Sequence, residues 1–460
     1  MDDGQRASLA SFIARYTART DRSRQLAAQE RMHHADPRSA AHFDIAWKDL
    51  VYPIASDRSN GSRIWDVDGN EYIDIAMGFG VHMFGHQPPF VVKAIREQLE
   101  LGYQLGPQSH LAASVAERIC SLTEMERVVF CNSGSEAVMT ALRLARAVTG
   151  RDTVALFTDS YHGTFDGVLA RSRLGSSGEA LSGAPGTPRG MVADLLVLEY
   201  GNEESLEILR RRGPELAAIL VEPVQSRRPE LQPIEFLVSL REIADEGGAA
   251  LIFDEIISGF RVHPRGAQGW FDVRADIATY GKMLAGGLPI GVVAGAASYL
   301  DAIDGGRWEY GDDSVPSAPQ TFFAGTFAKH PLTLAATLAV LSHLEDAGPS
   351  LQDDLNARTS AMREALNLYF EREQLPLSAA GFGSQFIFRF ASRARFSDLF
   401  SYRLIEKGVY VWEGRTCYLS TAHTDDDVAR VSAAVRESAD ELASEGFLPR
   451  QSEPGPTAVG

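Results

Sequence analysis

The chain has 460 residues, and its 44 Lys and Arg against 61 Asp and Glu give a formal net charge of −17. This acidic balance argues against nucleic acid or an anionic membrane as the main partner, because both bind through basic surfaces. Hydrophobic residues make up 45% of the chain, without an apolar run long enough to cross a membrane or an N-terminal secretion signal. This hydrophobic content is enough for a large core. Three cysteines are too few for a disulfide framework, so we expect a soluble cytoplasmic protein.

The N-terminal part predicts a helix followed by a hairpin. Residues 1–35 carry apolar side chains at the spacing of an amphipathic helix. These are Leu9, Phe12, Ile13 and Tyr16. In residues 62–75, the turn signal Asp68-Gly69-Asn70 separates two alternating segments, which is typical of a β-hairpin.

From about residue 85 to residue 300 the sequence alternates short apolar runs, small-residue loops and helical segments. The runs are continuous in hydrophobicity, which is typical of strands buried on both faces of a parallel sheet. They span residues 128–131, 154–157, 195–198, 218–221 and 250–253. We therefore predict an α/β fold with covering helices.

The C-terminal part predicts a mixture of helices and strands. Helices are expected at residues 335–347, 352–374 and 425–443, and strands at 385–390 and 409–412. Residues 171–190 are rich in Gly, Ser and Pro and are too long for a simple connection, so we predict a lid or entrance loop there. The last residues, 451–460, are expected to be disordered.

Ligands of an open parallel sheet bind where the strands end, so the residues after each predicted strand are candidates for a site. After the first run, residues 132–137 form a small-residue loop that opens a helix. Ser133, Gly134 and Ser135 there would present backbone N–H groups and the positive end of the helix dipole. The loop is therefore a phosphate site or, alternatively, a plain capped turn.

Two further strand ends carry candidate side chains. Tyr161 and His162 follow the second run, where an aromatic ring could stack on a flat ligand or belong to the core. Asp254 and Glu255 follow the fifth run, and adjacent strand residues point to opposite faces. An unpaired buried carboxylate is costly, so these carboxylates are expected to have a partner. We predict that Asp254 is the one that faces the site; the alternative is a structural ion pair.

Lysine is scarce in this chain, since only five of the 44 basic residues are lysines. Lys282 lies in a Gly-flanked apolar segment, where desolvation would lower its pKa and make the amine nucleophilic; a surface turn is the alternative. A phosphate site, a stacking ring, a carboxylate and an amine together describe the cofactor pyridoxal 5′-phosphate (PLP). PLP uses a lysine Schiff base and an acidic partner for its ring nitrogen.

These motifs resemble the class III aminotransferases, and within them the glutamate-1-semialdehyde aminomutase branch, from about residue 45 to residue 445. The segments that carry the resemblance are residues 132–137, 161–163, 222–224, 254–261, 281–282 and 325–326. A narrower resemblance links the chain to the aminotransferase domains of hybrid polyketide/nonribosomal peptide synthetases, which aminate a β-ketoacyl group on a carrier protein. The segments in this case are residues 15–20, 222–229, 325–331 and 408–423.

The resemblance implies PLP fold type I, as in aspartate aminotransferase. This fold has a large domain with a mostly parallel seven-stranded sheet and a smaller α+β domain built from both termini. We accordingly expect an N-terminal helix and part of the small domain at residues 1–84, a large PLP-binding domain at 85–334, a C-terminal small domain at 335–447 and a disordered tail at 448–460.

Residue roles also follow from the resemblance. Lys282 would form the Schiff base and move the substrate proton, and Asp254 would pair with the ring nitrogen. Tyr161 and Ile256 would cover the two ring faces. Ser133, Gly134, Ser135 and His162 would complete the cofactor site, and Glu222 would lie near the ring edge. Thr326 would bind the phosphate of the neighbouring subunit, which implies a homodimer; no metal site is predicted.

One departure from the family pattern concerns substrate binding. Many ω-amino enzymes of the family carry a Glu where this chain has Arg227, and that Glu masks a C-terminal arginine. Residues 419–424 here contain no arginine. We hypothesise that Arg227 or Arg228 receives an anion, either the donor carboxylate or the phosphate of a carrier's phosphopantetheine arm.

The expected function is therefore that of a PLP-dependent transaminase of specialised, antibiotic-type metabolism. It would move an amino group from a small-molecule amino donor to a keto or aldehyde acceptor, with an acyl carrier protein as a possible partner. The alternatives are an amino-sugar or other small aldehyde as acceptor, a PLP-dependent aminomutase or epimerase, and a non-catalytic regulator or scaffold.

Overall fold

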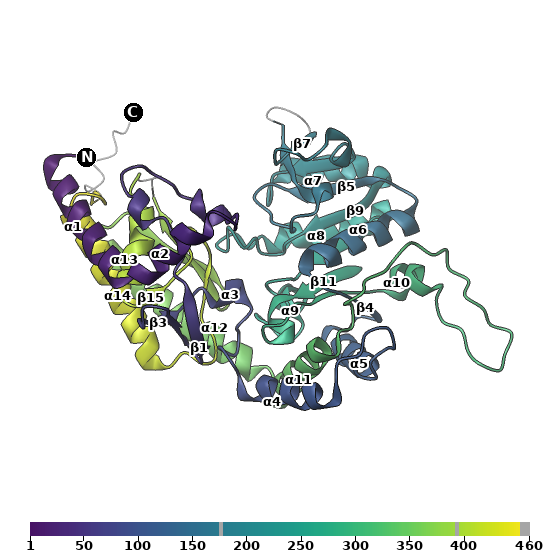
Figure 1. The fold of residues 1–460 in the computed structure, drawn as a ribbon. Coiled ribbons are helices and arrows are strands. Elements are labelled where there is room, and N and C mark those ends of the chain that lie inside the picture. Colours follow the sequence, from purple (N-terminus) through teal and green to yellow (C-terminus); the bar gives the residue numbers. More distant parts are fainter. Residues whose placement is uncertain (174–177, 392–394, 451–460) are drawn as a thin grey trace, which may run out of the picture. The chain divides into compact units, whose positions relative to one another are not determined.

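The computed structural model describes residues 1–173, 178–391 and 395–450. The chain forms two compact units, one made of Met1–Pro88 and Leu355–Gly460 and the other of Pro89–Asp354 (Figure 1). The disorder predicted for residues 451–460 lies outside the described residues. Within those ranges, no helix combines the length and the apolar character that a membrane crossing requires.

The Pro89–Asp354 unit is built on a seven-stranded sheet in the order β4-β12-β11-β10-β9-β5-β8. Neighbouring strands are parallel except at β12, which runs antiparallel to β11 and β4. All five apolar runs predicted as strands are in this sheet, which confirms the α/β prediction. The strands are β4 Arg127–Cys131, β5 Thr153–Phe157, β8 Leu195–Leu198, β9 Leu216–Val221, β10 Ala250–Asp254, β11 Ile277–Gly281 and β12 Gly291–Gly295.

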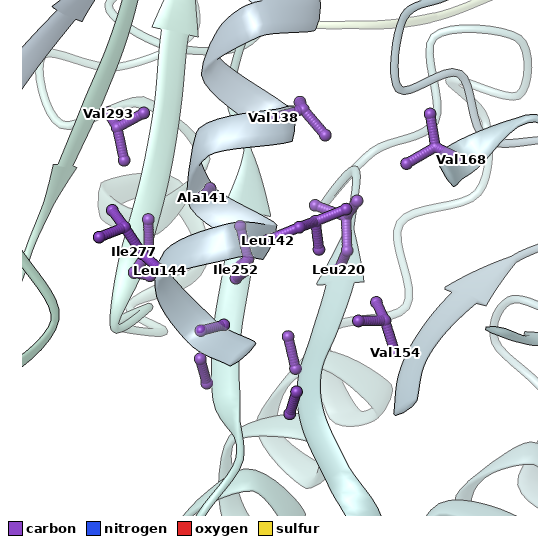
Figure 2. Close-up of a cluster of buried hydrophobic side chains, with 14 of the residues drawn as sticks. Val138, Ala141, Leu142, Leu144, Val154, Val168, Leu220, Ile252, Ile277 and Val293 are labelled. Carbon is purple, nitrogen blue, oxygen red and sulfur yellow. The ribbon is translucent and has the colours of Figure 1, made fainter. Parts of the chain in front are cut away.

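Helix α6, Gly134–Thr149, packs its apolar face on five strands of this sheet, β4 and β9 to β12. Figure 2 shows Val138, Ala141 and Leu142 of the helix among branched side chains of the strands. The small alanines on this face let helix and sheet approach closely, and Gly150 ends the helix with a φ of +68°. The core beneath α6 thereby fixes where the N-terminus of the helix points.

The remaining helices of this unit are α4 Pro89–Leu101, α5 Leu111–Thr123, α7 Glu203–Arg212, α8 Ile234–Gly247, α9 Gly266–Phe271, α10 Ala297–Asp304 and α11 Pro331–Ala347. Of these, α4 and α5 precede the first strand of the sheet and the others come between or after its strands, as is common in an α/β fold. Helix α11, which was expected in the C-terminal part of the chain, packs against α4 and α5. Between α10 and α11 the chain runs as a long extended loop, drawn in green in Figure 1.

The predicted entrance loop, residues 171–190, contains regular structure. Strands β6 Ala170–Ser172 and β7 Ala180–Ser182 pair as a short antiparallel ribbon. The residues between them are partly outside the described ranges, at positions 174–177.

In the other unit, the prediction of a single helix for residues 1–35 is wrong. The chain forms α1 Asp3–Arg19 and α2 Asp21–Glu30, separated at Thr20, where φ is −122° and ψ is 34°. The hydroxyl of Thr20 lies 2.8 Å from the Tyr16 carbonyl oxygen and 2.7 Å from the Tyr52 hydroxyl oxygen. These local and tertiary hydrogen bonds compete with continued helix, which a periodicity of apolar residues cannot reveal.

Two small sheets complete this unit. One has the order β1-β2-β3-β15 and contains the predicted hairpin, whose strands pair antiparallel; the other has the order β13-β14-β16. The strands are β1 Ser56–Asn60, β2 Arg63–Asp66, β3 Glu71–Asp74, β13 Leu377–Phe382, β14 Gln385–Phe390, β15 Val409–Tyr410 and β16 Cys417–Tyr418. The helices besides α1 and α2 are α3 Met77–Gly80, α12 Ser350–Arg372, which begins in the other unit, α13 Asp398–Glu406 and α14 Asp425–Ser444.

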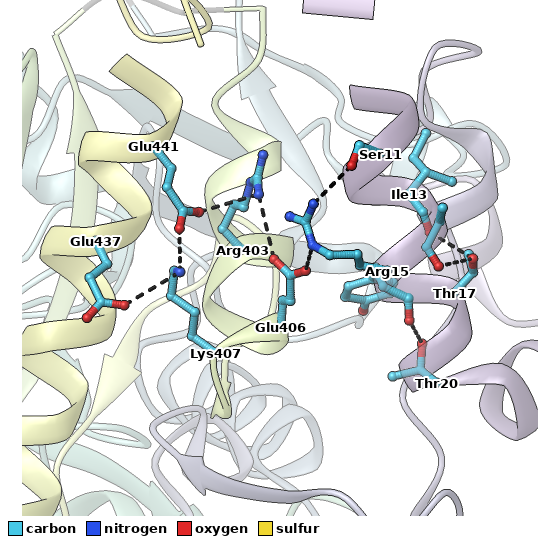
Figure 3. Close-up of polar contacts among 12 residues, drawn as sticks. Ser11, Ile13, Arg15, Thr17, Thr20, Arg403, Glu406, Lys407, Glu437 and Glu441 are labelled. Carbon is cyan, nitrogen blue, oxygen red and sulfur yellow. Dashed lines mark hydrogen bonds and ion pairs between the residues drawn. The ribbon is translucent and has the colours of Figure 1, made fainter. Parts of the chain in front are cut away.

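Ion pairs link the helices α1, α13 and α14 (Figure 3). Glu406 of α13 accepts from Arg15 Nε of α1 at 2.9 Å, and Lys407 Nζ lies 2.7 Å from Glu441 of α14. The guanidinium of Arg403 is buried between these partners, 3.4 Å from Glu441. The network joins the two ends of the chain in one compact unit.

Candidate active site

A cavity of about 190 Å³ opens where five strands of the large sheet end, β4, β5, β9, β10 and β11. All of its lining residues belong to the Pro89–Asp354 unit. Nine of them are site residues predicted from the sequence, namely Ser133, Gly134, Ser135, Tyr161, His162, Glu222, Asp254, Ile256 and Lys282. Val138, Gly163 and Ile257 line the cavity as well and were not predicted.

The N-terminus of α6 forms one wall of the cavity. The helix begins at Gly134, four residues earlier than expected, and the Ser133 hydroxyl caps it by accepting from the Glu136 N–H at 3.3 Å. The N–H groups of Gly134 and Ser135 lie in the first turn, where a helix provides them no internal partner. Together with the helix dipole they make this wall suited to an anion such as phosphate.

Close packing at this wall requires glycine at two positions. A Cβ on Gly134 would lie 2.9 Å from Ile256 Cδ1. Gly163 has a φ of +90°, and a Cβ there would lie 2.2 Å from the Ser135 hydroxyl oxygen. The wall therefore leaves its backbone accessible because no side chain occupies these places.

Asp254 is one of two carboxylates that line the cavity, with Glu222, and it is held from two sides. His162 Nδ1 lies 2.7 Å from one of its oxygens, and the Ile256 N–H donates to the other at 3.2 Å. Thr279 Oγ1 donates to that second oxygen at 3.3 Å. Among the described residues, the buried Nε2 of His162 has no hydrogen-bond partner.

Lys282 follows β11 directly and begins a 3₁₀ turn with a φ of +45°. This left-handed conformation is strained for a residue with a side chain, and such strain is concentrated at functional sites. Burial lowers the pKa of the amine, and the acidic groups of Asp254 and Glu222 oppose that effect. The lowered pKa leaves more of the amine unprotonated and nucleophilic.

Glu222, whose role the sequence left open, joins two strand-end turns. Its buried carboxylate accepts from the Tyr161 N–H at 2.8 Å and from the Ser226 N–H at 3.2 Å. Burial raises the pKa of this carboxyl. Glu222 thus fixes the backbone that presents Tyr161 to the cavity.

The structure does not bring all predicted site residues together. Thr326 is exposed on the segment between α10 and α11 and is not among the described residues that line the cavity. Its neighbour Gly325 lies near Asn132, since a Cβ on it would be 3.6 Å from Asn132 Nδ2. Arg227 is exposed and Arg228 is half-buried, both in the turn after β9.

Thr279 is a polar neighbour of the site that sequence reasoning missed. It stands opposite Asp254 in the parallel register of β10 and β11. The signal available was its place three residues before Lys282, but β11 was not recognised as a strand. In the described part of the chain, no group of three or more His, Cys, Asp or Glu residues could hold a metal ion.

A family model described as aminotransferase class-III matches residues 45–427, which is most of the chain. The chain belongs to the class III aminotransferases. This assignment agrees with the strand-end site, and it places Lys282 and Asp254 within the matched region. The aminotransferase has the fold of PLP-dependent enzymes of fold type I.

Individual relatives extend over nearly the whole aminotransferase. It is 34% identical over 415 residues to glutamate-1-semialdehyde 2,1-aminomutase 2 from Exiguobacterium sp., which covers 86% of this chain and 92% of the relative. A solved transaminase with PLP bound has a TM-score of 0.83 and 28% identity, covering 93% and 99% of the two chains. A β-phenylalanine aminotransferase from Variovorax paradoxus has a TM-score of 0.81 and 27% identity, covering 97% and 99%.

Proposed function

We propose that this class III aminotransferase moves an amino group from an amino-acid donor to a keto or aldehyde acceptor. The observation that carries the proposal is the single cavity that gathers Lys282, Asp254 and the first turn of α6. PLP is the cofactor of the family, and it offers an aldehyde for an amine and a ring that withdraws electrons from the reacting carbon.

The residues of the cavity fit this cofactor in number and in kind. Gly134 and Ser135 would donate N–H groups to its phosphate, and Tyr161 and Ile256 would cover its ring. The carboxylate of Asp254 would hold a proton on the ring nitrogen, and the bond from His162 Nδ1 orients that carboxylate. The buried and unpartnered Nε2 of His162 adds a polar atom that a bound group would satisfy.

Lys282 Nζ would tether the cofactor and, as a free amine, take and return the substrate proton. Its lowered pKa supports both tasks, because an unprotonated amine is needed for attack and for proton removal. The strained backbone at Lys282 supports a functional role for the same residue.

As acceptor we propose a β-ketoacyl thioester on an acyl carrier protein, in specialised, antibiotic-type metabolism. The support is the resemblance of residues 222–229, 325–331 and 408–423 to aminotransferase domains of hybrid synthetases. An aminomutase is the second candidate, since the Exiguobacterium relative carries that name. The two differ in whether an external amino donor is needed.

We also propose a homodimer in which Thr326 binds the phosphate at the neighbouring subunit's site. The segment between α10 and α11 exposes large apolar side chains that water disfavours, as expected of a surface covered by a partner. These are Trp308, Tyr310, Val315, Phe322 and Phe327. Thr326 lies among them, exposed to solvent.

The deciding experiment loads the purified protein with pyridoxamine phosphate and offers one acceptor at a time. The acceptors are a carrier-bound β-ketoacyl thioester, a free keto acid and an aldehydo-sugar. We expect the visible absorbance of lysine-bound cofactor to return with the thioester. Return with a different acceptor contradicts the carrier-bound substrate, and isomerisation of an amino-aldehyde without external donor favours the aminomutase.

Lys282→Ala is the matched test of the cofactor site. This variant should lose the visible absorbance of covalently bound PLP and lower turnover by about 10²–10⁴-fold, because it removes both the amine and the base. Lys93→Ala, on the exposed face of α4, is the control and should retain the absorbance. Equal absorbance in the Lys282→Ala variant and the wild type would contradict the assignment.

A further inference from the structure

The turn that follows β5 passes through a strained conformation just before it reaches the cavity. Asp159 has a φ of +62°, in the left-handed region that residues with a side chain rarely adopt. Asp tolerates this region better than most residues, but the Asp159 side chain is exposed, so its burial does not hold the backbone there. Such strain persists only where the surrounding structure fixes the backbone, so residues outside the turn must hold it.

Gln225, in the turn after β9, holds the strained position from both sides. Its side chain is fully buried, and its Nε2 donates to the Thr158 carbonyl oxygen at 2.6 Å and to Ser160 Oγ at 2.9 Å. A carbonyl oxygen can only accept, so the amide must face it with its NH₂ group, and both donors of that group are used. Because Thr158 and Ser160 flank Asp159, one buried side chain fixes the chain on either side of the strained residue.

Two residues after Asp159 the turn presents Tyr161, which lines the cavity. The Tyr161 side chain is 44% exposed, so packing around the ring does little to fix where it lies. The backbone is held instead, since Glu222 accepts from the Tyr161 N–H at 2.8 Å and Gln225 bonds the preceding residue, Ser160. The position of the ring therefore follows from the position of the turn, and a side chain already in place loses less conformational freedom when a ligand binds against it.

We infer that Gln225 is a positioning residue of the cofactor site and that it acts through Tyr161. By holding the turn after β5, it places the tyrosine ring where a flat cofactor ring can stack on it. Gln225 is not among the described residues that line the cavity, so it acts without touching the cofactor. The inference rests on the proposed function, in which Tyr161 covers one face of the PLP ring.

A double-mutant cycle on PLP affinity tests this coupling. Gln225→Met keeps the length of the side chain but removes both hydrogen bonds, and it should raise the dissociation constant of PLP about tenfold. Tyr161→Ala should raise it by a similar factor, because the stacking ring is lost. In the Tyr161→Ala protein, Gln225→Met should raise it further by no more than about twofold, since no ring is left to position. A tenfold loss in both backgrounds overturns the inference.

The matched control is Gln352→Met, in α12. Gln352 is buried as well and donates from Nε2 to the Phe260 carbonyl oxygen at 2.9 Å, but it does not bond the turn that carries Tyr161. This variant should lower thermal stability as Gln225→Met does and keep PLP affinity within about twofold of the wild type. Equal losses of PLP affinity in the two variants would also overturn the inference. If Gln225→Met does not fold, Ser160→Ala removes one of the two bonds and should raise the dissociation constant about threefold, only where Tyr161 is present.

Absorbance titration of the PLP-free protein with PLP gives these constants without turnover. A wild type that binds PLP but does not transaminate contradicts the proposed reaction, and the cycle still decides the role of Gln225. A wild type that does not bind PLP contradicts the cofactor site and overturns the inference with it.

Discussion

Asp254 and Glu255 are adjacent carboxylates that the fold puts to different uses. Asp254 faces the cavity, whereas Glu255 points into the core and accepts from Ser258 Oγ at 2.5 Å and from the N–H groups of Ala267 and Gln268. Burial raises the pKa of Glu255 to about 7, against the hydrogen bonds that lower it. At the scale of single residues, a buried carboxyl outside the site is therefore a source of pH-dependent stability.

The first prediction concerns that pH dependence. Between its unfolded pKa of 4.5 and its folded pKa of about 7, Glu255 keeps a proton in the native state that the unfolded chain has lost. Stability should therefore fall as pH rises through this range, by about 3 kcal/mol at about 1.4 kcal/mol per tenfold change in proton affinity. Urea unfolding from pH 4.5 to pH 8 should show a shallower decline for Glu255→Gln. Parallel curves for the variant and the wild type would contradict the assignment.

At the scale of elements, the position of α6 creates the cavity wall that is suited to an anion. The helix is fixed by its apolar face on β4 and on β9 to β12 (Figure 2). Its N-terminus meets the turn after β5 at Gly163, where an added Cβ would lie 2.2 Å from the Ser135 hydroxyl oxygen. The Thr164 N–H donates to Ser135 Oγ at 3.1 Å, which joins the turn to the first turn of the helix. The site thus depends on one helix end and one turn fitting without side chains between them.

The second prediction compares Gly163, beside the N-terminus of α6, with Gly150, which ends the same helix. Gly163→Ala should destabilise the protein by about 1–3 kcal/mol and weaken PLP binding about tenfold, because the new Cβ would overlap Ser135. Gly150→Ala, at the far end of α6, has a similar positive φ but nothing within 4 Å of its Cβ. This control should cost about 1 kcal/mol and leave PLP affinity unchanged. Thermal unfolding and PLP titration measure the two effects, and equal PLP affinities in both variants would contradict the role of Gly163.

At the scale of the whole molecule, the segment between α10 and α11 suggests assembly. Phe322 is 77% exposed and Tyr310 is 92% exposed, although both side chains are large and carry apolar rings. Exposed apolar side chains that are close together along one segment are typical of an interface. The proposed role of Thr326 would couple this interface to the cofactor site.

The third prediction is that Phe322→Asp weakens the dimer. A charge in an apolar interface should raise the dimer dissociation constant about 100-fold or more, and PLP affinity should fall with it because Thr326 would be withdrawn. Sedimentation velocity and PLP titration measure the two quantities. Leu368→Asp, on an exposed face of α12, is the matched control. A Phe322→Asp protein that stays dimeric, or a monomeric wild type, would contradict the proposal.

The sequence predicted a strand correctly where four or more consecutive residues are apolar. The five runs of branched apolar residues are strands because both faces of a parallel sheet are covered. β11 and β12 were not recognised, since Gly, Ala and Thr interrupt their apolar character. In chain order those two strands flank Lys282, so the sequence identified the lysine but not the strands that hold it.

The sequence by itself determined which chemical groups end the strands, Ser133 to Ser135, Tyr161, Asp254 and Lys282, because each follows an apolar run or a glycine-rich segment. Only the tertiary structure decided how these groups meet. The register of β10 and β11 places Thr279 beside Asp254, and the carboxylate of Glu222 joins two turns by hydrogen bonds. The guanidinium of Arg227 comes to lie over the Tyr161 ring. The physical reason is that strand ends are local in sequence, whereas register, packing and side-chain partners depend on segments far apart in the chain.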